Sequence, residues 1–338
     1  MRNFTDRLID EIDKYDNPSC IGLDPRIDEI PTFLAEAAMK ECDVKPGDIS
    51  NAAWAASARA IEMFNERLID ATHDLVPGYK LQWAFYEPFK EHGVRAFEKT
   101  ANYAKSKGKI VIGDGKRNDI ADTAEAYADA HLGVVGLVTG VYVSGLNEDA
   151  LTVTPYLGSD GLRPFIDVCK RFGKGIFVLT KTSNNSGVEI QDLMLAENHG
   201  GRRVFEQVAL KAEILGRDLL GKRGYSSVGI VVGATGNTPE ELRQQAKRIR
   251  ELNPFAITLV PAYGQQGGTA KDTVPAFTGE GYGAIVNNSR GIMFAYQREP
   301  YKDKYRPEEF EKASRDATLA MKDDMRNTLK ASGFRRWV

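Results

Sequence analysis

The chain has 338 residues, which is enough for one large domain or two of ordinary size. Its 45 lysines and arginines are balanced by 47 acidic residues, and a net charge of -2 gives no general attraction to nucleic acid or to an anionic membrane. The three cysteines are widely spaced and form no CxxC pair. Their spacing argues against a disulfide framework or a thiolate zinc site and fits a reducing compartment such as the cytoplasm.

Residues 1–16 carry apolar side chains at helical spacing between charged ones, which predicts an amphipathic helix. This segment lacks the uninterrupted apolar core that a signal peptide needs. The longest uncharged stretch, residues 132–147, is too short and too rich in glycine to cross a membrane. We therefore expect a soluble protein without membrane attachment.

Eight short β-rich runs follow, several of them apolar at nearly every position, as expected of parallel strands covered on both faces. They span residues 19–24, 79–85, 109–114, 150–155, 174–180, 227–235, 255–263 and 282–289. Segments of helical composition lie between them, at residues 57–74, 95–106, 119–130, 202–220 and 239–251. This alternation, without a linker rich in Pro, Gly or Ser, predicts an α/β fold of the (β/α)8 TIM-barrel type as a single domain over residues 1–338. An open, doubly wound sheet is the alternative.

Two segments do not fit the repeat. Residues 26–56 form an acidic insertion after the first strand, and residues 132–147 are rich in glycine and valine. We expect both to lie outside the barrel as loop or helical elaborations. The tail after Pro300 is rich in both charges and predicts a terminal helix that packs on the barrel.

Polar residues cluster just past the carboxyl ends of the predicted strands. They are Asp24, Lys80, Asp114 with Lys116, Ser183, Gln266 and Arg290. Barrel enzymes place their sites on that face, because the loops that follow the strands converge there. The functional site is therefore expected at this end of the barrel.

The pattern DxKxxD, formed by Asp114, Lys116 and Asp119, follows a buried strand. The two-residue period of a strand places Asp114 and Lys116 on the same side, within reach of each other, and Asp119 is expected to open the next helix. A lysine flanked by carboxylates keeps its proton and can serve as a proton donor. The alternative is a strand-end salt bridge followed by an Asp N-cap, with Asp122 and Thr123 completing the first helical turn.

Two glycine-containing loops, PAYGQQGG at 261–268 and NNSRGI at 287–292, follow the seventh and eighth predicted strands. In barrels these two loops commonly bind a phosphate through backbone N–H groups. Gln266 and Arg290 would add side-chain donors, the arginine as a charged fork. Either loop alone fits a simple turn, but the pair favours a phosphate site.

With these motifs the chain resembles orotidine 5′-phosphate decarboxylases, in particular the longer bacterial-type branch of that family. The resemblance runs through CIGLDPR (20–26), KLQWAFYE (80–87), DGKRNDIADTAEAY (114–127), LTVTPYLG (151–158), LTKTSN (179–184), VGAT (232–235), LVPAYGQQGG (259–268) and NNSRG (287–291). It implies a TIM barrel that converts orotidine 5′-monophosphate to uridine 5′-monophosphate and CO2 without a cofactor or a metal. It also implies a homodimer with shared active sites.

The resemblance assigns a role to each matched residue. Lys80, Asp114, Lys116 and Asp119 match an alternating catalytic array in which Lys116 is the acid and Asp119 reaches into the site of the partner subunit. Asp24 and Lys80 match contacts to the ribose hydroxyls, and Thr123 matches one made across the interface. Ser183 matches a residue that binds the pyrimidine edge. Gln266, Arg290 and the backbone around Ser289 match the phosphate site.

The chain departs from the family pattern at a few positions. Lys181 stands where the longer branch has arginine, Gly115 where alanine is usual, and Ala262–Tyr263 where Gly-Val is usual. These differences leave open the shape of the pyrimidine and phosphate loops, including any contact made by Tyr263 or Gln265. The segment 132–147 leaves two interpretations open, a longer dimer contact or a longer loop.

Three other functions compete with this interpretation. A sugar-phosphate decarboxylase or aldolase of the same superfamily also carries DxKxxD but uses magnesium, and a nucleotide-binding protein without catalysis is a further alternative. A Schiff-base role for Lys116 is disfavoured, because flanking carboxylates favour the charged amine. The four histidines, His73, His92, His131 and His199, lie outside the motifs and are interpreted as surface or structural residues, which disfavours a histidine triad or metal centre.

Overall fold

In the computed structural model, which describes residues 1–233, 238–261, 263–264 and 268–337, eight parallel strands close into a barrel. The strands are β1 (Ser19–Leu23), β2 (Gly78–Gln82), β3 (Ile110–Arg117), β6 (Ala150–Val153), β7 (Gly175–Lys181), β8 (Ser226–Val232), β9 (Ala256–Val260) and β10 (Ala284–Asn288). Their order around the barrel is β1-β10-β9-β8-β7-β6-β3-β2. The predicted TIM barrel is confirmed, and the open sheet is wrong.

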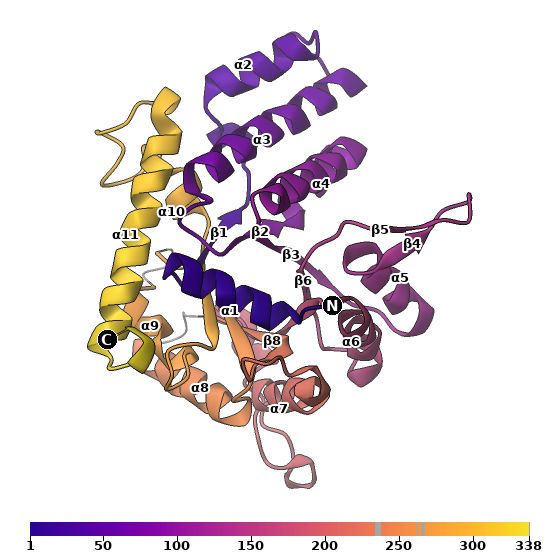
Figure 1. The fold of residues 1–338 in the computed structure, drawn as a ribbon, viewed down its shortest axis with the longest axis vertical. Helices are drawn as coiled ribbons and strands as arrows, with labels where there is room; N and C mark the ends of the chain where they lie inside the picture. The colour runs from indigo at the N-terminus through magenta and orange to yellow at the C-terminus, as the bar shows by residue number, and fades with distance from the viewer. Residues whose placement is uncertain (234–237, 262, 265–267, 338) are drawn as a thin grey trace.

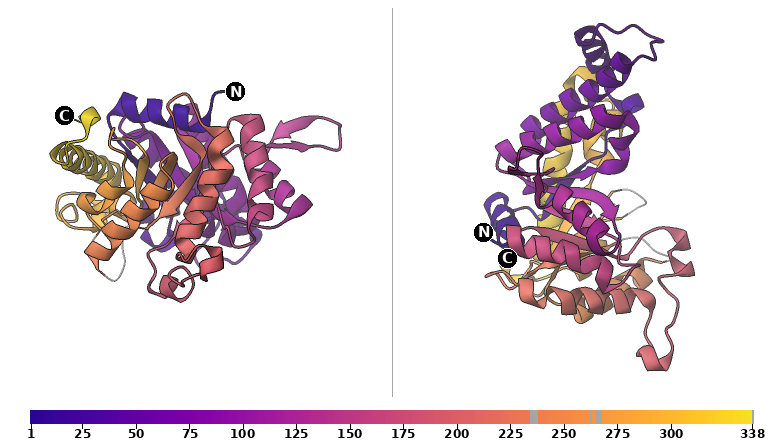
Figure 2. Two further views of the ribbon diagram at one scale, coloured as in Figure 1. Left: turned by 90° about the horizontal axis from the view of Figure 1, so that it is seen from below. Right: turned by 90° about the vertical axis from the view of Figure 1, so that its right-hand side faces the viewer.

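Helices surround the barrel (Figures 1 and 2). They are α1 (Phe4–Tyr15), α2 (Thr32–Glu41), α3 (Asn51–Thr72), α4 (Lys90–Ser106), α5 (Ala121–His131), α6 (Ser159–Phe172), α7 (Val204–Gly216), α8 (Pro239–Leu252), α9 (Ala270–Thr273), α10 (Arg290–Met293) and α11 (Phe310–Ala331). All five predicted helices are present. The bounds of the predicted strands agree with the structure to within three residues where they are described. The last two residues of the strand predicted at 227–235 lie outside the described residues.

The amphipathic helix predicted at the N-terminus is α1, and it packs its apolar face against side chains that point into the barrel. The rings of Phe4 and Phe177 meet edge to face, with 5.9 Å between their centroids. Gly175 makes this approach possible, since a Cβ there would lie 2.3 Å from the Phe4 ring. Because α1 covers the amino-terminal end, the carboxyl end is the one available for a site.

Two predicted boundaries were wrong near the site. The strand predicted at 79–85 ends at Gln82, and Trp83 begins a short 3-10 turn in which its indole donates to Glu148. Asp119 does not open α5, which begins at Ala121. The Asp119 carboxylate instead accepts from the backbone N–H of Ile120, at 2.8 Å, just before the sharp turn in which Ala121 has a φ of 50°.

The two insertions differ in kind. Residues 26–50 contain the predicted helical elaboration, α2, but Asn51 to Ala56 already belong to α3, so the insertion is shorter than expected. Residues 132–147 lie outside the barrel, as predicted, but they form an antiparallel hairpin of β4 (Val134–Gly136) and β5 (Tyr142–Ser144) rather than a loop or a helix. Figures 1 and 2 show the hairpin projecting away from the barrel. Its β-branched residues and the turn at Gly140, with a φ of 80°, favour this form.

The predicted terminal helix is confirmed as α11, which packs on α3 and α10. Phe310, Met325 and Leu329 from this helix are fully buried. Within the part of the chain that the structure describes, no helix is long and apolar enough to span a membrane.

Candidate active site

The site is organised around the Asp114 carboxylate at the carboxyl end of β3. Lys116 places its Nζ 2.7 Å from Asp114 Oδ1, which confirms that the two side chains share one side of the strand. Lys80, on the neighbouring strand β2, places its Nζ 2.8 Å from Asp114 Oδ2. Asp114 and Lys80 are almost completely buried, whereas the Lys116 side chain is 44% exposed and faces the open end of the barrel.

Two further donors complete the environment of Asp114. Gln82 Nε2 lies 2.8 Å from Oδ2, and Thr152 Oγ1 on β6 lies 2.8 Å from Oδ1. Sequence reasoning missed both residues, although Gln82 follows Lys80 at strand spacing in KLQWAFYE and Thr152 lies in LTVTP. With four donors around it, the carboxylate is held in one orientation.

Electrostatics keep this array ionised. Burial by itself would raise the pKa of the Asp114 carboxyl, but the ammonium groups of Lys80 and Lys116 outweigh it and hold that pKa well below its usual range. Burial would lower the pKa of Lys80, and the carboxylates of Asp114 and Asp24 reverse this effect, so that its pKa lies above the usual value. The charges are therefore fixed before any ligand binds.

Asp24 follows β1 and faces Lys80, with 3.9 Å between Asp24 Oδ1 and Lys80 Nζ. Oδ1 is buried and makes no hydrogen bond to any residue that the structure describes. A buried carboxylate oxygen of this kind is suited to accept a hydrogen bond from a ligand hydroxyl.

Two adjoining cavities meet at the charged array, and both are lined by Lys80, Asp114, Lys116 and Pro261. The first, of about 280 Å³, is otherwise polar and is lined by Asp24, Arg26, Gln82, Tyr263, Asn287, Ser289 and Arg290. The second, of about 290 Å³, is more apolar and is lined by Thr152, Leu179, Thr182, Ser183, Asn184, Val231 and Leu259. The pair fits a ligand with a charged, hydroxyl-rich end and a flat, weakly polar end.

The predicted phosphate residues lie at the polar end where they are described. Ser289 and Arg290 follow β10 and line the first cavity. Gly22 on β1 permits this arrangement, since a Cβ there would lie 1.9 Å from the Ser289 hydroxyl oxygen. Gln266, and with it Gln265, lies outside the described residues.

Asp119 and Thr123 are placed differently from the other predicted residues. Neither is among the described residues that line the two cavities. Thr123 is exposed on the first turn of α5, and Asp119 is partly exposed just before it. In this chain they point to a surface next to the site rather than into it.

Residues 20–302 match the model of the "Orotidine 5'-phosphate decarboxylase / HUMPS family". The chain belongs to this family. It is 39% identical over 325 residues to the orotidine 5'-phosphate decarboxylase of Caldicellulosiruptor saccharolyticus, covering 96% of this chain and 98% of the relative. Identity is also 39% over 326 residues with that of Rhodopirellula baltica, covering 96% and 100%.

Solved structures with the same fold include the OMP decarboxylase of Leishmania donovani, with a TM-score of 0.67 and 28% identity over 97% of this chain and 99% of that one. A putative orotidine 5'-phosphate decarboxylase from Streptomyces avermitilis matches with a TM-score of 0.71 and 26% identity, covering 98% and 97%. The similarity to this decarboxylase family therefore extends over almost the whole chain in both sequence and fold.

Two of the residues that depart from the decarboxylase family pattern, Lys181 and Tyr263, make specific side-chain contacts. Lys181 binds both carboxylate oxygens of Asp192, each at 2.9 Å, so it anchors the loop that carries Ser183. Tyr263 lines the polar cavity and donates its hydroxyl to Asp324 on α11. Ala262 lies outside the described residues.

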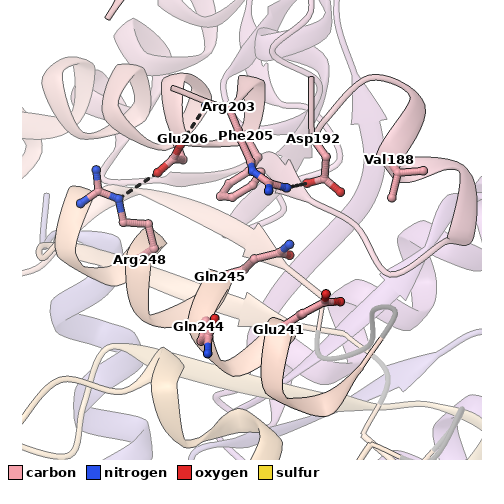
Figure 3. Close-up of a pocket in the computed structure, with 9 residues that line it drawn as sticks. All are labelled: Val188, Asp192, Arg203, Phe205, Glu206, Glu241, Gln244, Gln245 and Arg248. Carbon is pink, nitrogen blue, oxygen red and sulfur yellow. Dashed lines mark hydrogen bonds and ion pairs between the residues drawn. The ribbon is translucent and has the colours of Figure 1, made fainter. Parts of the chain in front are cut away.

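A third cavity, of about 550 Å³, lies behind the Ser183 loop, between the beginning of α7 and α8 (Figure 3). Four of its charged groups form ion pairs: Asp192 lies 3.6 Å from Arg203, and Glu206 lies 2.8 Å from Arg248. None of the predicted site residues that the structure describes lines it. We therefore place the candidate site at the two cavities of the barrel mouth.

Of the four histidines, His131 is structural, as predicted: it is 3% exposed and hydrogen-bonds to Glu148. His73 and His92 are partly exposed, and the His199 side chain is not among those described. Within the described residues, no group of three or more His, Cys, Asp or Glu side chains is arranged to hold a metal ion.

Proposed function

We propose that this chain decarboxylates orotidine 5′-monophosphate to uridine 5′-monophosphate in de novo pyrimidine synthesis, as a single-domain cytoplasmic enzyme without a cofactor or a metal. Family membership supports this activity. The observation that carries it is the ionised array of Lys80, Asp114 and Lys116, positioned where a polar cavity meets an apolar one. No nucleic acid or membrane partner is part of the proposal.

The reaction requires electrostatic stabilisation. When the bond between C6 and the carboxylate breaks, the electron pair stays in an sp2 orbital on C6 and cannot delocalise into the ring. A fixed ammonium beside C6 stabilises that charge in a site shielded from water. Lys116 is the proposed ammonium: it transfers a proton to C6 and is left as a neutral amine, while CO2 departs.

Asp114 has two functions in this proposal. It holds the Lys116 ammonium through the 2.7 Å contact, so that no reorganisation is needed as charge develops. It also places a second negative charge near the substrate carboxylate, and loss of CO2 relieves that repulsion. Lys80 fixes Asp114 from the opposite side.

The rest of the substrate is assigned to the two cavities. Asp24 and Lys80 face the ribose hydroxyls, since the buried Asp24 oxygen is suited to accept such a bond. Arg290 and Ser289, together with Gln266, are proposed to bind the phosphate at the polar end. Ser183 is proposed to bind the edge of the pyrimidine, which lies between Leu179, Val231 and Leu259 in the apolar cavity.

The enzyme is proposed to act as a homodimer with shared active sites. Asp119 and Thr123 stand at the surface beside the barrel mouth and do not line the cavities of their own chain. In a twofold-symmetric pair, each chain would supply these residues to the other. Asp119 would then complete the charged array, and Thr123 would add a ribose contact.

A magnesium-dependent sugar-phosphate decarboxylase or aldolase is the competing function. The apolar cavity favours the nucleotide, because Leu179, Val231 and Leu259 suit a flat ring better than a hydrated sugar chain. A spectrophotometric assay with orotidine 5′-monophosphate, with and without EDTA, separates the two. We expect equal turnover in both conditions. Turnover only of a keto-sugar phosphate, and only with magnesium, would refute the proposal.

A further inference from the structure

A buried group of polar side chains lies behind the catalytic strand, on the outer face of β3. His131 at the end of α5 is 3% exposed, and Glu148, which precedes β6, is fully buried. Their contact joins His131 Nδ1 to Glu148 Oε1 at 3.1 Å, and Trp83 Nε1 donates to the same oxygen at 2.9 Å. Such a buried ionisable pair is costly to desolvate, and none of these residues lines the two site cavities.

Arg117, the residue after Lys116, connects this pair to the site. Its Nε donates to His131 Nε2 at 3.3 Å, and one terminal nitrogen donates to the Gly115 carbonyl at 3.1 Å. Arginine only donates, so His131 Nε2 must be the unprotonated nitrogen. The other ring nitrogen, Nδ1, then faces Glu148, so the contacts with Arg117 and Glu148 together orient the His131 ring.

The same group fills the space beside both glycines that flank Asp114. A Cβ on Gly113 would lie 2.1 Å from a Glu148 carboxylate oxygen. A Cβ on Gly115 would lie 3.2 Å from Trp83 and 3.5 Å from Arg117, so these side chains pack closely against the Gly115 backbone. The backbone on either side of Asp114 therefore rests directly on these side chains.

The backbone of Lys116 needs support, because its φ of 48° is one that a lysine rarely adopts. From the β6 side, the Lys116 N–H donates to Thr152 Oγ1 at 2.9 Å, and the Lys116 carbonyl accepts from Thr154 Oγ1 at 3.2 Å. From the outer side, Arg117 holds the preceding carbonyl. The turn that aims the Lys116 side chain is thus held from two directions.

We propose that Arg117, His131 and Glu148 form a positioning relay that fixes the Gly115–Lys116 backbone and so aims the Lys116 ammonium at the reacting carbon. The three residues touch no part of the proposed substrate site and act through Lys116. The inference rests on the proposed function, since the rate of decarboxylation is the measurement that depends on the position of the Lys116 ammonium. A displacement of about 1 Å at a reacting group lowers a rate on the order of 100-fold.

The test uses Arg117→Met, which keeps the stem of the side chain and removes its donors, and His131→Phe. We expect kcat for orotidine 5′-monophosphate to fall on the order of 100-fold in each, while the Kd for uridine 5′-monophosphate changes by less than about threefold. His131→Gln retains a donor and an acceptor and should recover most of the rate. Glu87→Gln is the matched control: it removes only the outer ion pair of Arg117, which spans 2.6 Å, and should leave kcat unchanged.

The thermal unfolding midpoint of each variant distinguishes a loss of Lys116 positioning from a general loss of stability. Unchanged kcat in folded Arg117→Met and His131→Phe would overturn the relay. A parallel loss of kcat, nucleotide affinity and thermal midpoint, with no recovery in His131→Gln, would also overturn it. Inactivity of the unmodified chain on orotidine 5′-monophosphate would instead refute the proposed function and the relay that rests on it.

Discussion

The two-residue spacing of Lys116 and Asp114 places them near each other at the end of β3, and a left-handed turn at Lys116, with a φ of 48°, accompanies their 2.7 Å contact. What the spacing does not supply is the environment of the pair. Lys80 and Thr152 reach Asp114 from the strands on either side of β3; both orient its carboxylate, and the Lys80 ammonium also lowers its pKa. The chemistry at the residue scale therefore depends on three adjacent strands.

Replacing Lys116 tests its role directly. Lys116→Ala removes both the charge that stabilises C6 and the proton donor, so kcat is expected to fall by about 10⁴-fold or more. Binding of uridine 5′-monophosphate should remain measurable by calorimetry, because the phosphate and ribose contacts are intact. Lys40→Ala, an exposed lysine on α2, is the control and should match the unmodified enzyme. Undiminished turnover in Lys116→Ala would remove it from catalysis.

Asp114→Asn tests the electrostatics of the array through stability. The substitution leaves the Lys80 ammonium buried beside that of Lys116 without the carboxylate between them. The free energy of unfolding at pH 7 is therefore expected to fall by about 3 kcal/mol. The pKa of Asp114 is lowered in the folded state, so its contribution is fully present above the ordinary value of 3.8 and declines as the pH falls below it. Urea unfolding at several pH values measures the difference in free energy of unfolding between the unmodified protein and Asp114→Asn. This difference should narrow only below about pH 4. A gap that is absent at pH 7 would contradict the assignment.

Among the helices and strands, α1 and β3 have different functions at opposite ends of the barrel. Helix α1 closes the amino end of the barrel with Phe4, Leu8 and Ile12, so that end is a hydrophobic core. The carboxyl end of β3 carries charged residues and a left-handed backbone at Lys116. The hydrophobic core and the catalytic charges thus lie at opposite ends of the barrel axis.

Phe4→Ala tests that separation. Loss of the ring leaves a cavity against Phe177 and Gly175, and the free energy of unfolding is expected to drop by about 3–5 kcal/mol. The kcat of the folded fraction should stay unchanged, because the charged array lies at the opposite end. Denaturant unfolding and steady-state kinetics measure the two effects. A loss of kcat without a loss of stability would show that the two ends are coupled.

At the scale of the whole molecule, the site of one chain is proposed to need residues from another. Asp119 and Thr123 stand outside the cavities of their own chain, while Asp24, Lys80, Asp114 and Lys116 lie within them. A catalytic array divided in this way makes activity a property of the dimer.

Mixing two inactive variants tests the shared site. In a heterodimer of Lys116→Ala and Asp119→Ala chains, one site carries both changes and the other carries neither. Random exchange of subunits in an equal mixture should restore about a quarter of the normal activity. Co-expression followed by an activity assay checks this, and two Lys116→Ala chains provide the control. A mixture that remains inactive despite formation of heterodimers would mean that each chain has a complete site of its own.

The amino-acid sequence was enough to predict the order of the eight strands, the helices between them and the gathering of Asp24, Lys80, Asp114, Lys116, Ser183 and Arg290 at the barrel mouth, although Lys80, Asp114 and Lys116 lie within β2 and β3 rather than past their ends. It could do so because apolar runs and strand periodicity are local properties. The beginning of α5 did not follow from composition, because it depends on the left-handed turn at Ala121, whose φ is 50°.

Which side chains meet across the barrel could not be predicted before the strands and helices were placed in space. Gln82 and Thr152 become ligands of Asp114, and Arg117 contacts His131, only when β2, β3, β6 and α5 are brought together. Whether a buried polar group is satisfied depends on neighbours that are distant in the chain. For that reason Lys116 was identifiable from its motif, whereas the contacts that hold it in position were not.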